Sequence, residues 1–347
     1  AYFKRPFLKL TRAFIKPAFA ETVSTTNKTG EDYNTITLWE DATDIDLVSA
    51  TNGETLEVYN DEGALNEKIT FAGATTNSSY YRKVTVPSAE RHGASFGGGA
   101  RNIYTTELSN EYIVEVDEAY FVLEWLEISG GSLGDYTTNG YVYMNGRYST
   151  IRYTLIGNIT ASWHMNGIIC NNYESDKNIL IYRNIIAKIA ANNTTAIYTG
   201  FDGSNTASNV ANYNTIYDVD NSSGTDRGVN CASDSSTCIG NLVFDAGTDF
   251  IFDSSSTHDY NAASDSTTSE ETNGVGSIDA DDFVSSTDFH LAIGATPIDK
   301  GSDLGSPYNY DIDGVQITGT WDIGADEYVA TYYPFKKFNH GINVGVF

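Results

Sequence analysis

The sequence predicts an all-β solenoid, a parallel β-helix, and the first observation behind this prediction is a repeat between residues 120 and 252. Each repeat has a few β-forming residues, then a polar residue, then two or three apolar residues. If Trp125, Thr154, Asn184, Asn214 and Asn241 are equivalent, successive steps are 29, 30, 30 and 27 residues. A unit of this length built on short strands cannot bury its apolar face alone, so successive turns must stack.

The contents of the repeat decide which kind of solenoid is formed. The apolar runs are short, rich in Val, Ile, Tyr and Thr, and separated by Asn, Gly, Ser and Asp, which favours strands and tight turns over helices. An Asn also recurs at the same point of three successive turns, at positions 184, 214 and 241. An inward Asn at a corner can hydrogen-bond its own turn and the Asn stacked above it. The repeats are Phe121–Ile128, Ser149–Ile156, Leu180–Ala187, Val210–Tyr217 and Cys238–Asp245.

Residues 1–20 form a basic, aromatic N-terminal arm, with five basic residues and no acidic one. Between Pro6 and Pro17 the stretch is amphipathic if helical, but it is too short to be a stable helix alone. The small residues before Glu21 also fit a signal peptide, and a membrane-surface helix is a third interpretation. We favour a docking arm, because Lys9, Arg12 and Lys16 interrupt any apolar core of a signal. The predicted docking residues here are Phe3, Lys4, Arg5, Phe7, Lys9, Leu10, Arg12, Phe14 and Lys16.

The body of the coil follows the arm. Residues 21–100 are expected to hold an N-terminal cap and the first turns, with a strand followed by one short helix or turn in Asp32–Leu47 closing the first turn. Strands are expected within Glu54–Asp61, Lys68–Thr76 and Arg82–Ser88. His92, in the Gly-rich stretch that follows, is expected to be a surface-loop histidine.

Residues 101–252 are then expected to form the regular repeats, and residues 253–328 the last turns and a closing segment. Within that region Asp253–Ser277 is rich in Ser, Thr and Asp, so it is expected to leave the coil as a long excursion.

A second basic, aromatic arm is predicted at residues 329–347, which contain two lysines and no acidic residue. Its predicted docking residues are Phe335, Lys336, Lys337 and Phe338. Two such arms suit a subunit of a larger assembly, because an arm adds buried aromatic area and a linked second contact.

The composition excludes some partners. The chain of 347 residues has a net charge of −26, and all 46 acidic residues lie between the arms, together with 13 basic ones. So acidic a body is not expected to bind nucleic acid. No apolar run approaches the length of a membrane span. The 24 tyrosines are assigned mainly to the sheets, with sugar contacts and protein interfaces as further uses.

Three cysteines, Cys170, Cys231 and Cys238, make no disulfide framework and no zinc motif. Cys231 and Cys238 are close enough in sequence to close a small loop if the protein is exported. We nevertheless expect mainly reduced cysteines that act as small apolar residues.

Several segments resemble the right-handed parallel β-helix proteins of bacteria and their phages, in the broad pectate-lyase-like group. They are DYNTITLWEDA at the start, Glu90–Gly93, Tyr120–Gly131, and the closing Asp281–Gly305 and Asp311–Tyr328. The resemblance covers most of Asp32–Tyr328 and implies a right-handed coil. It implies little about activity, because this fold is found in lyases, hydrolases, adhesins and viral spikes.

An active site is not located by the sequence. Enzymes of the group use clustered Asp residues with calcium and a basic residue, or acidic residues on adjacent turns. The repeated strands carry Glu124, Glu127, Arg152, Arg183 and Lys188, but no Asp set at equivalent positions. Asp311, Asp313 and Asp322 are a calcium alternative, although Asp-Gly steps favour a role in capping turns. No cofactor is otherwise expected, and no catalytic residue is assigned.

The sequence therefore predicts a structural subunit of a virion or extracellular assembly: a capsid decoration, fibre or tailspike-like protein. Its arms would dock on a protein scaffold such as a capsid or tail. Its acidic body would be exposed on a virion, outside the cell or at the cell surface, as part of a homo-oligomer in contact with polysaccharide. The alternatives are a secreted carbohydrate-active enzyme, a polysaccharide lyase or hydrolase, and a surface adhesin.

Overall fold

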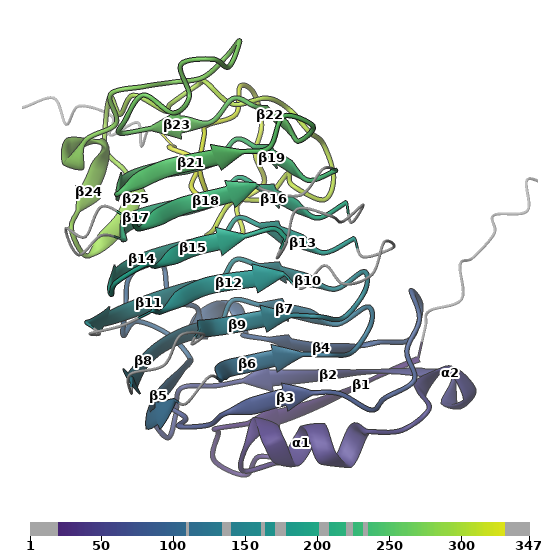
Figure 1. Ribbon diagram of the computed structural model, residues 1–347. Helices are drawn as coiled ribbons and strands as arrows, with labels where there is room; N and C mark the ends of the chain where they lie inside the picture. The colour runs from purple at the N-terminus through teal and green to yellow at the C-terminus, as the bar shows by residue number, and fades with distance from the viewer. Residues whose placement is uncertain are drawn as a thin grey trace, which may run out of the picture.

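The chain winds into a coil of three parallel sheets in the computed structural model, which describes residues 20–108, 111–133, 140–160, 164–170, 178–200, 208–219, 225–231 and 235–329. Figure 1 shows the turns stacked on one another, from helix α1 (Ile36–Thr43) at the base to strands β22 and β23 at the top, in a right-handed coil. The predicted all-β parallel β-helix is confirmed.

Each regular turn contributes one strand to each sheet, and every strand pairs in parallel with its counterparts above and below. The first sheet has nine strands: β1 (Ala20–Thr26), β2 (Asn52–Val58), β4 (Arg82–Thr85), β7 (Val122–Glu124), β10 (Thr150–Arg152), β13 (Leu180–Tyr182), β16 (Val210–Asn212), β19 (Thr237–Ile239) and β22 (Thr257–Asp259). The second has seven: β5 (Arg101–Leu108), β8 (Glu127–Leu133), β11 (Leu155–Thr160), β14 (Ile185–Ala190), β17 (Thr215–Val219), β20 (Leu242–Ala246) and β23 (Ala262–Ala263). The third also has seven: β3 (Ile69–Phe71), β6 (Tyr112–Val116), β9 (Gly140–Met144), β12 (Asn166–Cys170), β15 (Thr195–Tyr198), β18 (Arg227–Cys231) and β21 (Thr248–Phe252).

The corner between the first and second sheets explains the sequence repeat. One residue there has a positive φ in successive turns, for example 69° at Trp125, 55° at Tyr153 and 56° at Arg183. This left-handed conformation bends the chain sharply before the next strand begins. The pairing of β10 with β7 and of β11 with β8 makes Thr154 equivalent to Leu126. Our alignment of Thr154 with Trp125 was therefore wrong by one residue.

The predicted Asn ladder lies directly after this corner and is confirmed. The Nδ2 of Asn184 donates to Oδ1 of Asn214 at 3.0 Å, and the Nδ2 of Asn214 donates to Oδ1 of Asn241 at 3.0 Å. Asn241 continues the ladder to Asn261 at 3.2 Å, one turn further than the sequence repeat indicated. Each Nδ2 also reaches a backbone carbonyl of the turn below, as Asn214 does with Ile181 at 3.0 Å. The ladder thus satisfies the buried polar groups of the corner.

A helical cap closes the first turns at the base of the coil. Helix α1 begins after Thr35, whose hydroxyl accepts a hydrogen bond from the Leu38 amide at 3.0 Å, and it buries Trp39. The short helix α2 (Leu47–Ala50) follows. Arg82, which is fully buried, pairs with Glu40 of α1 at 3.1 Å and with Glu118. Of the strand followed by a helix or turn expected within Asp32–Leu47, the helix is therefore present, whereas the strand is reduced to an isolated bridge between Tyr33 and Thr26. An ion pair ties the helix to the next turns.

The last turn lies within the stretch that the sequence indicated as an excursion. Strands β22 and β23 extend the first and second sheets, so that prediction was wrong for residues 257–263. Residues 264–277 then cross the end of the coil, where Val275 forms a parallel bridge with Ala262.

A closing strap, residues 278–329, runs back along the outside of the coil, and Figure 1 draws it in green and yellow beside the upper turns. It contains the short 3-10 helix Ala280–Asp282 and the antiparallel pair β24 (Phe283–Ser285) and β25 (Asp288–Leu291). A second 3-10 helix, Ser88–Glu90, lies in an earlier loop. The Gly324 amide donates to the Gly240 carbonyl at 2.8 Å, and the Phe289 amide donates to the Ala94 carbonyl at 3.2 Å. The strap therefore connects the last turns to a loop near the start of the repeats.

Candidate functional site

The docking residues predicted from the sequence lie outside the described residues, because the described chain begins at Ala20 and ends at Val329. Both arms and their basic and aromatic residues therefore stay predictions. Two places on the body gather polar and aromatic side chains: a pocket at the end of the coil and a cluster on the strap.

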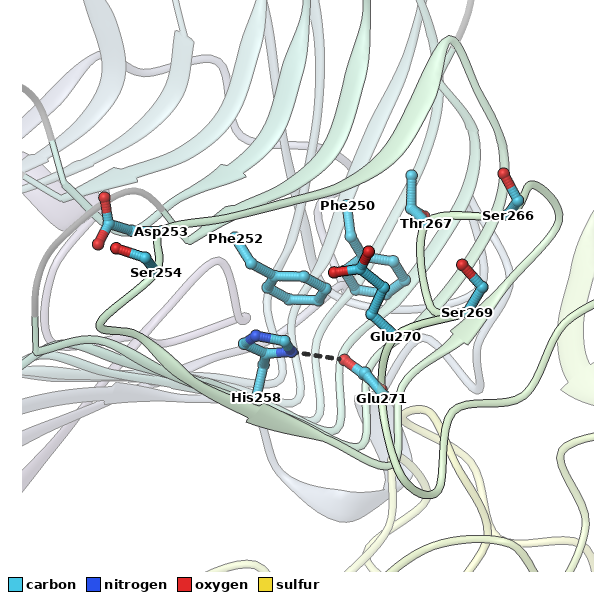
Figure 2. Close-up of a pocket in the computed structure, with 10 residues that line it drawn as sticks. All are labelled: Phe250, Phe252, Asp253, Ser254, His258, Ser266, Thr267, Ser269, Glu270 and Glu271. Atoms are coloured by element: carbon cyan, nitrogen blue, oxygen red, sulfur yellow. Dashed lines mark hydrogen bonds and ion pairs between the residues drawn. The ribbon is translucent and has the colours of Figure 1, made fainter.

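The first place, which we call the pole pocket, is a hollow of about 400 Å³ at the end of the coil opposite α1 (Figure 2). The third sheet ends at β21, so no further strand of that sheet covers the aromatic side chains of β21. The hollow lies above these side chains. Phe250 continues the register of Ile197 and Val229, which are buried in the turns below. His258 pairs in register with Cys238. The pocket is lined by Phe250, Phe252, Asp253, Ser254, His258, Ser266, Thr267, Ser269, Glu270 and Glu271.

Three stacked rings form one wall of the pole pocket. The rings of Phe250 and Phe252 have centroids 5.3 Å apart at 15°, and those of Phe252 and His258 are 3.9 Å apart at 5°. Glu270, an exposed residue, directs its carboxylate toward the phenylalanine rings in Figure 2. The pocket therefore combines an aromatic wall with carboxylates and hydroxyl groups at its opening.

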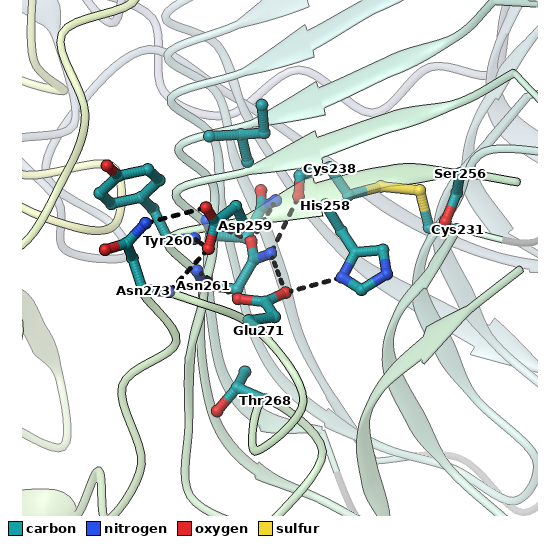
Figure 3. A network of polar contacts seen from close by, with 12 residues as sticks. Cys231, Cys238, Ser256, His258, Asp259, Tyr260, Asn261, Thr268, Glu271 and Asn273 are labelled. Atoms are coloured by element: carbon teal, nitrogen blue, oxygen red, sulfur yellow. Dashed lines mark hydrogen bonds and ion pairs between the residues drawn. A yellow bond between two sulfur atoms is a disulfide. The ribbon is translucent and has the colours of Figure 1, made fainter. Parts of the chain in front are cut away.

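Glu271 has a different role, because its carboxylate ends the Asn ladder (Figure 3). It accepts hydrogen bonds from Asn261 Nδ2 at 2.7 Å and from the Asn261 amide at 3.0 Å. His258 Nδ1 lies 3.1 Å from the same carboxylate. Through these contacts Glu271 caps the last asparagine of the ladder. Asp253 and Glu270 are the other carboxylates of the pocket.

A disulfide between Cys231 and Cys238 lies beside this network (Figure 3). It joins the end of β18 to β19 inside the coil, where both residues are fully buried. The expectation of mainly reduced cysteines was therefore wrong for this pair. The sequence contained the signal, a separation of seven residues, but not the fact that both side chains point into one interior.

The second place is a strap cluster centred on His290. Its Nδ1 lies 2.6 Å from Asp288 and its Nε2 lies 3.1 Å from Asp313. Burial opposes the charging of His290, but Asp313, Asp326 and Asp288 outweigh it and raise the pKa to about 10. The hydrogen bond from His290 in turn lowers the pKa of Asp313. We interpret the arrangement as an imidazolium clamped between two carboxylates.

The calcium alternative named Asp311, Asp313 and Asp322, and the structure separates these residues by role. Asp311 accepts hydrogen bonds from the amides of Asp313 and Val315 at 3.0 and 2.7 Å. Asp322 accepts one from the Asp299 amide at 2.7 Å. The preferred interpretation, that these aspartates cap turns, is therefore confirmed for Asp311, whereas Asp322 joins two separate segments of the strap. A calcium site stays an expectation.

The group whose ligand atoms do converge, within 4.8 Å, is His290, Asp313 and Asp326. It faces a shallow hollow of about 430 Å³ on the strap. Both ring nitrogens of His290 are engaged by carboxylates, and calcium prefers oxygen ligands, so this group does not match a calcium site.

Three charged residues of the repeated strands, Glu124, Arg152 and Lys188, are engaged in ion pairs. Glu124 lies 2.5 Å from Arg152 Nη2, and Lys188 lies 2.6 Å from Asp218. Arg183 is fully buried beneath the strap and donates to the Gly324 carbonyl at 2.6 Å.

His92, expected on the surface, is instead only 2% exposed. Its Nδ1 accepts a hydrogen bond from the Ala94 amide at 3.1 Å, so its Nε2 donates to the Tyr153 carbonyl at 2.8 Å. Burial lowers its pKa to about 4. The Gly-rich loop around it folds onto the coil, which the local sequence did not indicate.

Comparison with known proteins adds no family to this description. The chain matches no protein-family profile, and a search among curated proteins finds no match either. Within the part of the chain that the structure describes, no helix is long and apolar enough to cross a membrane.

Proposed function

We propose that the protein is a structural subunit of a virion or extracellular assembly, of the capsid-decoration, fibre or tailspike-like kind. In this proposal the basic, aromatic arms dock on a protein scaffold, and the acidic body of pectate-lyase-like β-helix type stays exposed. The observation that carries the proposal is the strapped coil itself. Its described polar side chains are used largely to hold turn to turn, and the strap fixes several turns from outside, which suits a rigid exposed element.

The charge distribution supports the docking part of the proposal. All 46 acidic residues lie between the two arms, which contain basic residues alone among their charged groups. The opposite charges of arm and body would attract an arm to an acidic surface, including the body of a neighbouring copy. The disulfide supports a place outside the cytoplasm, because disulfides persist in oxidising compartments.

Sedimentation of the protein from its native source tests this proposal. The intact chain should travel with a large particle, and a chain with Lys4, Arg5, Lys9, Arg12 and Lys16 changed to Glu should remain in the soluble fraction. The matched control is Glu62→Lys, which changes an exposed charge near the base of the coil. If the arm variant sediments like the intact chain, the docking proposal is wrong.

A second candidate function, glycan binding by an adhesin, is favoured by the pole pocket. Carboxylates and hydroxyl groups beside stacked rings are the groups that contact sugars, and the pocket volume falls in the range of small-ligand sites. A glycan array tests this candidate directly. Retention of a glycan that is lost in Glu270→Ala would support it, and release of sugar from that glycan would instead favour a carbohydrate-active enzyme.

A further inference from the structure

The pole pocket and Ala20, the residue at which the N-terminal arm joins the coil, lie toward opposite ends of the coil. Strand β1, which follows the arm, is the outermost strand of the first sheet at the base, and β21 and β22 are the outermost strands at the top (Figure 1). When two copies stack along the coil axis in the same direction, the end of the upper copy to which its arm is attached therefore faces the end of the lower copy that carries the pole pocket. The C-terminal arm, in contrast, leaves from Val329 beside the strap cluster on the flank.

The chemistry of the pole pocket is complementary to that of the arm. Asp253 and Glu270 place negative charge at the opening, and Phe250, Phe252 and His258 form a stacked aromatic wall. The arm alternates basic residues with aromatic ones over residues 1–20 and contains no acidic residue. A volume of about 400 Å³ admits an aromatic side chain of the arm, with its basic neighbours next to the carboxylates.

The geometry points to an end-to-end contact between copies, in which the N-terminal arm of one copy docks in the pole pocket of the next. This inference rests on the proposed function and names the partner of one arm as a second copy of the chain. The contact joins two different surfaces and is therefore heterologous, so it does not close on itself in a two-fold dimer. Repeated along the coil axis, it produces an open row of stacked coils.

A pair of full-length variants tests the contact. In the arm variant the five basic residues of the arm are changed to Glu, which leaves the pole pocket intact. In the pole variant Glu270→Lys is combined with Asp253→Asn, which leaves the arm intact. Each variant alone should sediment as a monomer of 37.8 kDa, while the unaltered chain should form larger species.

The mixture of the two variants separates this contact from other modes of association. The pocket of the arm variant can accept the arm of the pole variant. The resulting dimer has no further intact arm or pocket to offer, so an equimolar mixture should give a one-to-one dimer. Lys300→Glu, an exposed charge change on the strap along the flank, should associate like the unaltered chain. Raising the salt concentration from about 50 mM to about 500 mM should weaken association, because exposed charges are screened.

Several outcomes would overturn the inference. An unaltered chain that stays monomeric, a pole variant that associates like the unaltered chain, or a mixture that stays monomeric each excludes the contact. If changing Lys336 and Lys337 to Glu abolishes association while the N-terminal arm is intact, the contact between copies belongs to the C-terminal arm. If the unaltered chain is monomeric yet still sediments with the native particle through its N-terminal arm, the inference fails while the proposed function stands.

Discussion

At the scale of single residues, the protein depends on side chains that serve the turn above and the turn below at once. Asn214 accepts a hydrogen bond from Asn184 Nδ2 and donates to Asn241 Oδ1 and to the Ile181 carbonyl. The residue is fully buried. Removing one member of such a column leaves partners on both sides without hydrogen bonds, and this is costly in a buried site.

Asn214→Ala should accordingly lower the free energy of unfolding by about 2–4 kcal/mol, because each buried polar group left unsatisfied costs about 1–3 kcal/mol. Asn273→Ala is the matched control, since Asn273 is exposed and donates to Asp259. Chemical denaturation of both variants measures the difference. Equal, small losses in the two variants would show that the ladder contributes little to stability.

The two histidines at the strap differ in charge. His290 is held as an imidazolium, with its pKa raised to about 10, and burial lowers the pKa of His92 to about 4. NMR of the labelled imidazole rings between about pH 5 and pH 8 should therefore show His290 protonated and His92 neutral throughout. Titration of His290 near pH 6.5, the ordinary value, would contradict the clamp.

At the scale of elements, the strap and the last turn replace the covering that a further turn of the coil would give to the upper turns. They cover the exposed sheet surface and use carboxylates as caps. Burial raises the pKa of Glu327 to about 7 and that of Asp311 to about 6. A carboxylate whose pKa is raised in the folded state favours folding while neutral, so its contribution is present below the unfolded pKa and is lost as the pH rises through the folded one.

Glu327→Gln should therefore stabilise the strap at about pH 8 and leave stability unchanged at about pH 4.5, with the difference developing between these values. The amide oxygen of Gln can replace the carboxylate that accepts the Asp322 amide at 3.0 Å. Thermal unfolding at the two pH values measures the effect, with Glu62→Gln as an exposed control. A shift in melting temperature that is the same at both pH values would contradict the raised pKa of Glu327.

The disulfide should stabilise the last turns. Replacing Cys231 and Cys238 by Ser should lower the free energy of unfolding by about 2–3 kcal/mol, as expected for a short closed loop. Peptide mapping without reductant should recover the two residues in one linked fragment. Separate fragments in protein isolated under oxidising conditions would contradict the disulfide.

The repeat was sufficient to predict the coil, its parallel strands and the Asn corner, because these features repeat along the sequence. What it did not predict depends on how the folded coil and the strap bring side chains together. The burial of His92, the position of Arg183 beneath Gly324 and the meeting of Cys231 with Cys238 each depend on how the coil folds around them. His290 was missed for the same reason, since its partner Asp313 lies 23 residues away on the strap.

At the scale of the whole molecule, the central claim is that this is a rigid coil whose arms connect it to an assembly. The body carries all the acidic charge and the arms carry only basic charge, so the separation is a property of the chain as a whole. In the end-to-end contact that we propose, the pole pocket is the partner surface of one of the arms. The rigid body would then serve as the spacing element of the assembly.

Sedimentation velocity of the full-length chain, beside the arm variant, tests this claim most directly. We expect the unaltered chain to form species larger than 37.8 kDa, alone or on its native particle, and the arm variant to stay a monomer in both settings. If the two chains sediment alike in both settings, the arms do not connect the protein to anything, and the claim is contradicted.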